Sequence, residues 1–470
     1  MNQKHISIHG HFYQPPRIDP RSGVIPQEKG AQPYENWTAR IHDECYLPNV
    51  QMKNFEKISF NFGATLTDWM KKNKPDTLAE IIRQENGIYA RHGVSNAMAQ
   101  PYIHAIMPLV NRREKETLVR WGIADYSHYF GHAPQGMWLP ETAVDLETLD
   151  VLAAHGIQFT ILAPWQAKDP ALDITRPYRI KTPTGREITA FFYNSFLSSE
   201  LSFNTSASME ADVFVKDWLI PQVNFMARDG EQFFLAASDG ELYGHHMKER
   251  EKFLSYLIQR ELPRDGFTPS FPALWLQAHP VTEYTEINEN TSWSCHHGIT
   301  RWKDVCGDAP SAYWKAPLRE FLDQLADAID AKYVLLASNY VDDPWALRET
   351  YIDFLLGRKP LPELIQAMSH KTLSEAEIQK MQWLLESQFE RLRMHSSDAW
   401  FFFDFDSIEP LNGLRYAAHA TQCMLRASGE DISQPLCAIL AQAKDNQSGL
   451  TGDSAFRNVM AEYPSFQKIY

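Results

Sequence analysis

The stretch from Gly136 to Thr142 reads GMWLPET and marks a change between two kinds of secondary structure. Pro140 disfavours helix at the preceding residue and has no N–H to donate to a sheet, so a strand over residues 136–139 should end there. Beyond Thr142, apolar residues recur at three- and four-residue steps, which predicts a helix. Glu141 therefore lies at a strand-to-helix junction beside a large aromatic residue. Barrels place catalytic groups at such junctions, although a carboxylate there could simply favour the helix dipole.

The same alternation of strand and helix extends over the first 285 residues. Apolar patterns predict further strands over residues 6–12, 57–62, 159–164, 188–193 and 232–237, with helices between them. About seven such strands fit a parallel barrel better than an open sheet, and no Gly-x-Gly-x-x-Gly motif suggests a dinucleotide. The remainder is helical in pattern. We therefore predict an α/β fold, with a (β/α)7 catalytic barrel over 1–285 and a mainly helical domain over 286–470.

Composition narrows the class of protein. The net charge is −14, which argues against a nucleic-acid partner and gives no support for binding an anionic membrane. The five cysteines are scattered and odd in number, so they do not form a disulfide framework. The first residues lack a signal-peptide pattern, and no apolar run is long enough to cross a membrane. We expect a reduced, cytoplasmic location.

A second carboxylate follows the strand over residues 232–237. The sequence there is SDGELYGHH, residues 238–246, which repeats the strand-to-turn geometry of Glu141 and offers Asp239 to the same rim. Two carboxylates are the minimum for glycoside hydrolysis, in which one attacks or positions water and the other protonates the leaving oxygen. Asp239 would need a raised pKa to act as the acid, which burial and a second carboxylate can supply. The alternative is an Asx turn, in which Asp239 bonds its own backbone.

Several histidines stand at predicted strand or loop ends. His9 and His11 share one strand face, and His104, His245 and His246 lie at other ends. Three converging imidazoles could bind zinc, but neutral histidines could equally bond sugar hydroxyls. No compact motif such as His-Glu-x-x-His is present, so we expect neither a metal nor another cofactor.

Two later segments are rich in aromatic and polar residues. Residues 293–306 read WSCHHGITRWKDVC, in which a Cys-His…Cys set resembles a partial zinc site. The irregular spacing favours instead a loop that contacts sugar or packs between domains. After the long C-terminal helix, Trp400 is expected to pack in a core and Asp398 to cap a helix.

Taken together, these stretches resemble glycoside hydrolase family 57, the α-glucan-active enzymes with a seven-stranded (β/α) barrel. The matching stretches are HFYQP (11–15), YIH (102–104) with Pro108, WLPE (138–141), DGELYGH (239–245), PVTEY (280–284) and SDAW (397–400). Asn96 stands where many members have Glu, and Ala105 replaces a common Pro. The segment from Trp293 to Cys306 is similar to a subgroup in which a domain of unknown function follows the barrel.

The resemblance implies that Glu141 is the nucleophile and Asp239 the general acid/base of a retaining enzyme on α-glucans or maltooligosaccharides. It implies an amylase-like hydrolysis of α-1,4 bonds with accompanying transglycosylation, and a helical domain that contributes to the substrate cleft. Transfer of 4-α-glucan units and branching stay open, as do a metal-dependent carbohydrate deacetylase and a non-catalytic glucan-binding protein. The oligomeric state is not indicated. The expected substrate contacts are His11, Gln14, Asn96, His104, Trp138, Glu241, His245, Trp293, His296, Trp302, Asp398 and Trp400.

Overall fold

The computed structural model describes residues 3–463, and the chain divides into two compact units. The predicted boundary at residue 285 is close to Ser294, where the main part of unit 1 ends, but unit 2 also takes in two short segments from earlier in the chain. Unit 1 comprises the chain up to Gln14, Gln27–Tyr102 and Val110–Ser294, and unit 2 comprises Pro15–Pro26, Ile103–Leu109 and the chain from Cys295 onward.

Unit 1 contains the strands, most of which are parallel. One sheet has the order β3-β2-β1-β7, with β8 also paired to β1, and a second has the order β4-β6-β5. Within the second sheet β5 is antiparallel to β6. The strands are β1 (Lys4–Phe12), β2 (Ser59–Phe62), β3 (Ala97–Met98), β4 (Phe159–Leu162), β5 (Tyr178–Lys181), β6 (Glu187–Phe192), β7 (Gln232–Asp239) and β8 (Phe267–Pro269).

Backbone contacts join the two sheets into the predicted barrel. Parallel bridges link Ala99 to Met137 and Gly136 to Phe159, so residues 136–137 stand between β3 and β4 as a strand-like segment. On the other side, the N–H of Asn194, just after β6, donates to the carbonyl of Leu235 in β7 at 2.6 Å. Among the described residues the ring therefore runs β7, β1, β2, β3, 136–137, β4 and β6.

The barrel interior is filled by alternate residues of the strands, as strand geometry requires. Buried apolar side chains come from Phe159 and Ile161 of β4, Phe191 of β6, and Phe233 and Leu235 of β7. The continuous apolar runs that predicted these strands arise because both strand faces are covered, one by this interior and one by helices.

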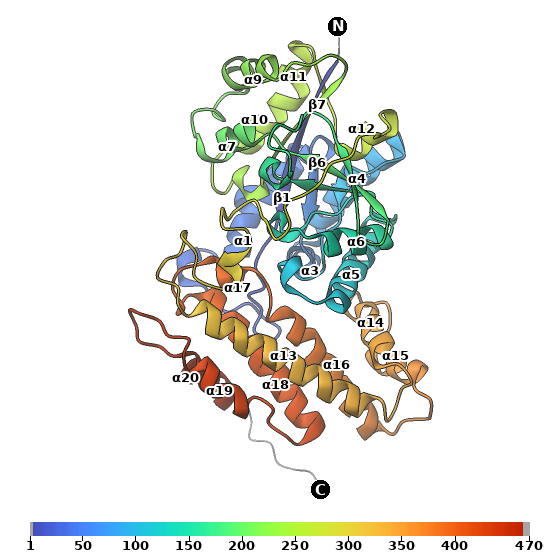
Figure 1. Ribbon diagram of the computed structural model, residues 1–470, viewed down its shortest axis with the longest axis vertical. Coiled ribbons are helices and arrows are strands. Elements are labelled where there is room, and N and C mark those ends of the chain that lie inside the picture. Colours follow the sequence, from blue (N-terminus) through green and yellow to red (C-terminus); the bar gives the residue numbers. More distant parts are fainter. Residues whose placement is uncertain (1–2, 464–470) are drawn as a thin grey trace. The chain divides into compact units, whose positions relative to one another are not determined.

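Helices surround the strands of unit 1. In Figure 1, α4, α5 and α6 lie on one side of β1, and α7, α9 and α10 lie on the other. The helices are α1 (Trp37–Ile41), α2 (Leu47–Gln51), α3 (Ala64–Asn73), α4 (Pro75–His92), α5 (Arg112–Phe130), α6 (Leu146–Ala154), α7 (Ser195–Phe203), α8 (Ala211–Phe214), α9 (Ile220–Phe225), α10 (Arg250–Tyr256), α11 (Leu262–Arg264) and α12 (Pro272–Ala278).

The helix expected directly after Glu141 starts later than the sequence pattern suggested. Residues Pro140–Thr142 form a single 3₁₀ turn, in which Glu141 and Thr142 adopt φ values of +56° and +48°. Left-handed residues cannot continue into a right-handed helix. Helix α6 begins only at Leu146, after Asp145 caps it by accepting from the N–H of Thr148. The prediction of a helix immediately after Thr142 was therefore wrong by about one turn.

Unit 2 is helical, and the long helices α13, α16 and α18 pack against one another (Figure 1). Ser374 and Glu377 form a capping box at the start of α16. Each earlier segment is hydrogen-bonded into this unit: Tyr416 donates to the carbonyl of Pro16, and the N–H of Ser397 donates to that of His104. The helices are α13 (Lys315–Ala337), α14 (Pro344–Leu355), α15 (Leu361–Met368), α16 (Glu375–Arg393), α17 (Asp398–Phe401), α18 (Ile408–Ser428), α19 (Cys437–Leu440) and α20 (Gly452–Ala461).

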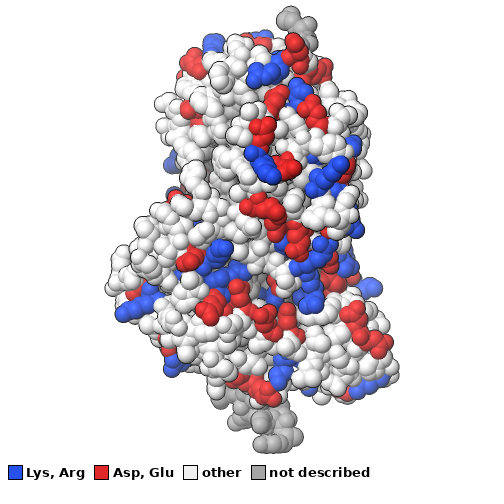
Figure 2. Space-filling view, in the orientation of Figure 1, with Lys and Arg blue, Asp and Glu red and all other residues white. Residues whose placement is uncertain are grey.

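Acidic and basic side chains are mixed over the face drawn in Figure 2, where both signs occur beside each other rather than in separate zones. Within residues 3–463, none of the helices combines the length and the apolar composition needed to span a bilayer.

Candidate active site

Strand register brings three polar side chains to one end of the barrel. His11 on β1 is paired with Asn61 on β2 and with Asp239 on β7. The three residues stand at or next to the C-terminal ends of neighbouring parallel strands, where barrel enzymes carry their active sites. The strand order thus explains why residues more than 170 positions apart in sequence, Asn61 and Asp239, reach the same rim.

Asp239 is the last residue of β7, and its surroundings favour the protonated form. Part of its surface is open to solvent, yet protein atoms enclose the carboxyl group closely. Desolvation, with the negative charge of Glu141 as a second cause, raises the pKa of Asp239 to about 7. A carboxyl group that is accessible and still protonated near neutral pH can donate a proton to a bound molecule.

Glu141 is held in place by hydrogen bonds from residues 293 and 294. Its Oε2 accepts from the indole N–H of Trp293 at 3.1 Å and from the hydroxyl of Ser294 at 2.5 Å. The backbone carbonyl of Glu141 also accepts from the N–H of Trp293 at 3.0 Å. Glu141 and Asp239 therefore have contrasting surroundings: two side chains donate hydrogen bonds to Glu141, whereas desolvation dominates at Asp239.

The left-handed backbone of Glu141 and Thr142 is stabilised by a buried glutamine. Such φ values cost non-glycine residues about 1–3 kcal/mol each and persist where neighbouring contacts fix them. The amide nitrogen of Gln166 donates to the carbonyl of Thr142 at 2.8 Å, and its oxygen accepts from the Thr142 hydroxyl at 2.9 Å. Gln166 has no exposed surface, so these bonds are not in competition with water.

Trp138 and two neutral histidines form a stacked group inside the barrel. The rings of His9 and His11 both stack on Trp138, with centroids 4.7 and 5.3 Å away. Burial first, and then the neighbouring His11, lowers the pKa of His9 to about 3, and burial lowers that of His11 to about 4. The amide of Asn61 contacts both histidines. Trp138 is fully buried, so its place is in this stack, and a direct sugar contact by it stays a prediction.

Glu241, Gln14 and Tyr46 form a second buried polar group near Asp239. Glu241 accepts from the hydroxyl of Tyr46 at 2.6 Å and from the backbone N–H of Tyr13 at 3.1 Å. Gln14 in turn donates to Tyr46 at 2.9 Å. Burial raises the pKa of Glu241 to about 8; the hydrogen bond from Tyr46 opposes this rise, and the charge of Asp239 adds to it. This network supports the turn after β7, and its members are largely enclosed.

Two further predicted substrate contacts, His245 and Asn96, interact with other residues of unit 1. His245 pairs with Glu44 at 2.5 Å. Asn96 is buried, and its amide nitrogen donates to the carbonyls of Phe55 and Ile58, in the chain that precedes β2. Asn96 thus connects the beginnings of β2 and β3, whereas Asp239 lies at the other end of its strand. A sugar contact by Asn96 stays a prediction, and these two bonds give the residue a structural role.

The other predicted contacts belong to unit 2. His104 and Ser397 are hydrogen-bonded at 2.6 Å, and Asp398 accepts from the hydroxyl of Ser396 at 2.6 Å. Asp398 is therefore the first residue of α17 rather than its cap, because Ser397 holds the cap position. Trp400 is buried, as predicted for a core residue, Trp302 is buried as well, and His296 is exposed. Their contribution to substrate binding stays a prediction.

Three residues at this site were not anticipated from the sequence: Asn61, Gln166 and Ser294. The sequence could have indicated Asn61, because it is a polar residue between two phenylalanines in the buried strand SFNF. Gln166 had no such signal, and Ser294 stood in the segment 293–306 without a role of its own, because both roles depend on loops that only the folded chain brings to Glu141.

The donor atoms near the two carboxylates do not converge as metal ligands. Within residues 3–463, two groups of candidate ligands have donor atoms that all lie within 4.8 Å of one another. One group is Cys295, His297, Cys306 and Asp308, and the other is Glu386, His419 and Cys423. Neither group includes Asp239 or His11. This geometry does not favour the deacetylase alternative, which needs Asp239 and the histidines around zinc.

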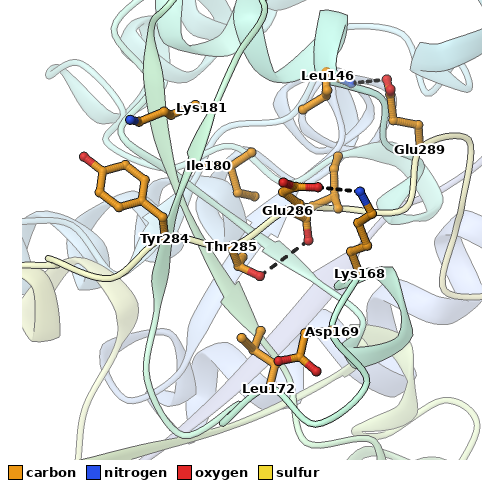
Figure 3. Close-up of a pocket in the computed structure, with 11 residues that line it drawn as sticks. Leu146, Lys168, Asp169, Leu172, Ile180, Lys181, Tyr284, Thr285, Glu286 and Glu289 are labelled. Atoms are coloured by element: carbon orange, nitrogen blue, oxygen red, sulfur yellow. Dashed lines mark hydrogen bonds and ion pairs between the residues drawn. The ribbon is translucent and has the colours of Figure 1, made fainter.

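A separate surface pocket of about 900 Å³ lies beside α6 and β5 (Figure 3). Its charged residues already have partners: Glu286 pairs with Lys168 at 2.5 Å, and Glu289 accepts from the N–H of Leu146 at 2.8 Å. Neither Glu141 nor Asp239 lines it. The carboxylates of the pocket are thus not the pair at the barrel rim, and the candidate active site is the rim at Glu141 and Asp239.

Comparison with known sequences gives matches over most of the chain. A model described as glycosyl hydrolase family 57 matches residues 6–289, and one described as a domain of unknown function (DUF3536) matches residues 311–466. No curated protein matches the sequence with significance.

Solved structures with the same fold are similar over nearly the whole chain. An exo-type maltose-forming amylase from Pyrococcus sp. ST04 has a TM-score of 0.74 at 14% identity, covering 97% of this chain and 88% of its own. A branching enzyme from Pyrococcus horikoshii has a TM-score of 0.63 at 15% identity, covering 98% of each chain. A 4-alpha-glucanotransferase from Thermococcus litoralis has a TM-score of 0.58 at 14% identity, covering 91% of this chain and 60% of its own. At these identities the likeness concerns the fold.

Proposed function

This chain belongs to glycosyl hydrolase family 57, and on that premise we propose that it is a retaining enzyme that cleaves α-1,4 bonds in α-glucans or maltooligosaccharides. Glu141 attacks the anomeric carbon and forms a covalent glycosyl-enzyme. Asp239 protonates the leaving glycosidic oxygen in that step. It then removes a proton from the incoming water, which releases the sugar with its original anomeric configuration.

The observation that supports these roles is the contrast between the two carboxyl groups. Desolvation and the charge of Glu141 raise the pKa of Asp239 to about 7, so Asp239 carries a proton to donate. Glu141 receives hydrogen bonds from Trp293 and Ser294, which suit an ionised nucleophile. Two carboxyl groups whose surroundings separate their proton affinities are the pattern expected of an acid and a nucleophile at one site.

The acceptor of the glycosyl group decides between hydrolysis and transfer. The named activities of the similar structures, maltose-forming amylase, glucanotransferase and branching enzyme, can all use a pair of carboxylates in this way. We propose hydrolysis as the main reaction, with sugar hydroxyls as alternative acceptors that give transglycosylation.

The decisive experiment incubates the purified protein with maltoheptaose and with amylopectin and separates the products by chromatography. Shorter maltooligosaccharides are expected for hydrolysis, longer linear products for transfer, and new branch points for branching. Proton NMR of the first products should show the α-anomer, because the reaction retains configuration. Binding of maltoheptaose with no product under any of these conditions would contradict catalysis.

The matched variants are Glu141→Gln and Asp239→Asn, with Glu286→Gln as the control. Glu286 is an exposed carboxylate that pairs with Lys168, so its change tests the effect of losing one negative charge. Glu141→Gln should lose on the order of 10³-fold or more in kcat while keeping its circular dichroism spectrum. A fully active Glu141→Gln protein would overturn the nucleophile assignment.

A further inference from the structure

The main segment of unit 2, from Cys295 onward, begins with two short turns that present matching pairs of metal-binding side chains. In the first turn the N–H of Gly298 donates to the carbonyl of Cys295 at 3.1 Å, and in the second the N–H of Ala309 donates to that of Cys306 at 2.9 Å. Each turn carries a thiol at its first position and a second donor two residues later. The second donors are His297 and Asp308.

The four donor atoms of these turns converge on one point. The two Sγ atoms, a ring nitrogen of His297 and a carboxylate oxygen of Asp308 all lie within 4.8 Å of one another. The Nδ1 atom of His297 is 4.0 Å from the Sγ of Cys295 and 3.7 Å from the Oδ2 of Asp308. Donors bound tetrahedrally to one zinc ion stand about 3.3–3.8 Å apart, given bonds of about 2.0–2.3 Å. Two pairs therefore have nearly this spacing.

The immediate surroundings suit a bound cation with thiolate ligands. Both cysteines are buried, whereas His297 is exposed, so an ion could enter from the side of His297. Gly307 lies directly against the Cε1–Nε2 edge of the His297 ring, where a Cβ would come within 2.8 Å of both atoms. A side chain at Gly307 would push the ring away, and with Gly307 present the Nδ1 edge can face the other donors.

Positive groups next to the cluster can balance the charge of its ligands. Arg301 pairs with Asp308 at 3.3 Å, and the buried Lys315 donates to the carbonyl of Arg301 at 3.0 Å. Two thiolates, a carboxylate and one Zn²⁺ would carry a net charge of −1, which Arg301 or Lys315 offsets. The cluster therefore has its charge partners in place.

We propose that Cys295, His297, Cys306 and Asp308 bind one zinc ion that fixes the start of unit 2. Two soft sulfur donors with one nitrogen and one oxygen favour zinc over calcium or magnesium. Four protein ligands complete a tetrahedron and leave no position for a substrate, so the site is structural. Binding converts both thiols to thiolates and releases their two protons to solvent. Between the turns, residues 298–305 have a single 3₁₀ turn, Thr300–Trp302, as regular structure, so the ion would replace missing backbone support.

The second candidate group, in α16 and α18, lacks these features. Both ring nitrogens of His419 already have partners, the hydroxyl of Tyr463 at 2.9 Å and Glu386 at 2.8 Å. The remaining donors are one carboxylate and one thiol. The zinc assignment therefore concerns the Cys295–Asp308 group alone.

The test measures zinc in the full-length protein purified from cells supplied with zinc and freed of loosely bound metal by gel filtration. Plasma mass spectrometry should find about one zinc ion per chain, as for a closed four-ligand site. The double variant C295S/C306S should retain less than about a tenth of this, while the control Cys437→Ser, outside both groups, should retain it fully. Zinc retained by the double variant would overturn the assignment.

A second measurement covers the case in which the double variant does not fold. The wild-type protein is stripped with a zinc chelator and followed by thermal unfolding, then reloaded with ZnCl₂ or CoCl₂. Chelation should lower Tm and ZnCl₂ should restore it, while Co²⁺ should give the visible absorption of a tetrahedral site and a thiolate charge-transfer band. Asp308→Cys, which supplies a third sulfur, should still bind zinc. An unchanged Tm together with no cobalt spectrum would refute the site. None of these readouts uses glycosidase activity.

Discussion

At the scale of single residues, the chemistry depends on how two carboxyl groups are surrounded. Asp239 is enclosed at the end of a strand, and Glu141 faces two hydrogen-bond donors. The sequence could predict that both residues reach one rim, because each follows an apolar strand. It could not predict the donors to Glu141, since Ser294 lies about 150 residues further along and carries no motif of its own.

The raised pKa of Asp239 predicts how activity depends on pH. The acid must be protonated, so kcat/KM for maltoheptaose should fall as pH rises through about 7. The Asp239→Asn variant should lose most of its activity, and its remaining kcat/KM should no longer fall as pH rises through about 7. It should recover much of the first step with α-maltosyl fluoride, whose leaving group needs little protonation. A wild-type profile that stays flat to pH 9 would contradict the acid role.

At the scale of elements, the turn Pro140–Thr142 is the feature that departs most from expectation. The apolar spacing after Thr142 predicts a helix that starts at once, but the left-handed conformations of Glu141 and Thr142 delay α6 until Leu146. Periodicity reports which faces are buried and carries no information on φ at a single position. By contrast, β4, β6 and β7 were predictable, since their apolar runs reflect burial on both faces.

Gln166 should act as a positioning residue through this turn. In Gln166→Ala the carbonyl and hydroxyl of Thr142 lose their buried partners, at a cost of about 1–3 kcal/mol for each unsatisfied group. We expect a lower Tm and a lower kcat with KM nearly unchanged, because Glu141 is displaced and the rest of the site is not.

The pH profile of Gln166→Ala should keep the wild-type shape, since the acid is untouched. Gln166→Glu is the conservative control: it keeps an acceptor for the Thr142 hydroxyl and the Ala163 N–H but has no amide to donate to the Thr142 carbonyl. Its kcat should lie between those of the wild type and Gln166→Ala. Equal kcat in all three proteins would show that the turn holds its conformation without this side chain.

At the scale of the whole molecule, the carboxyl groups of Glu241 and Asp239 link stability to pH. Glu241 and Asp239 have folded-state pKa values of about 8 and 7, whereas carboxyls in an unfolded chain titrate near 4. Between these values the two carboxyl groups bind more protons in the folded protein than in the unfolded one, so their contribution to the free energy of unfolding falls as pH rises from about 4 to 8.

Glu241→Gln should remove the part of this pH dependence that belongs to Glu241. The amide oxygen can still accept from Tyr46, and the amide cannot ionise. Calorimetry at pH 5 and pH 8 should therefore give a smaller drop in Tm for the variant than for the wild type. Equal drops in the two proteins would show that Glu241 titrates alike in the folded and unfolded chains.

The division of the chain could be predicted only in outline. Helical spacing after residue 286 indicated a helical region, and the helices are there. The inclusion of Pro15–Pro26 and Ile103–Leu109 in unit 2 could not be foreseen. These loops join unit 2 through contacts such as the hydrogen bond from Tyr416 to the carbonyl of Pro16, and local sequence says nothing about partners 400 residues away.

The scattered origin of unit 2 has a consequence for synthesis on the ribosome. Ile103–Leu109 leaves the exit tunnel long before Cys295 is made, and at about 5–20 residues per second the wait for the roughly 200 intervening residues lasts some tens of seconds. During that interval the buried residues Ile103, Ile106 and Met107 have no partners from the later chain. We expect these apolar side chains to stay exposed until the later segment is made, and cutting the gene at residue 294 would make that exposure permanent.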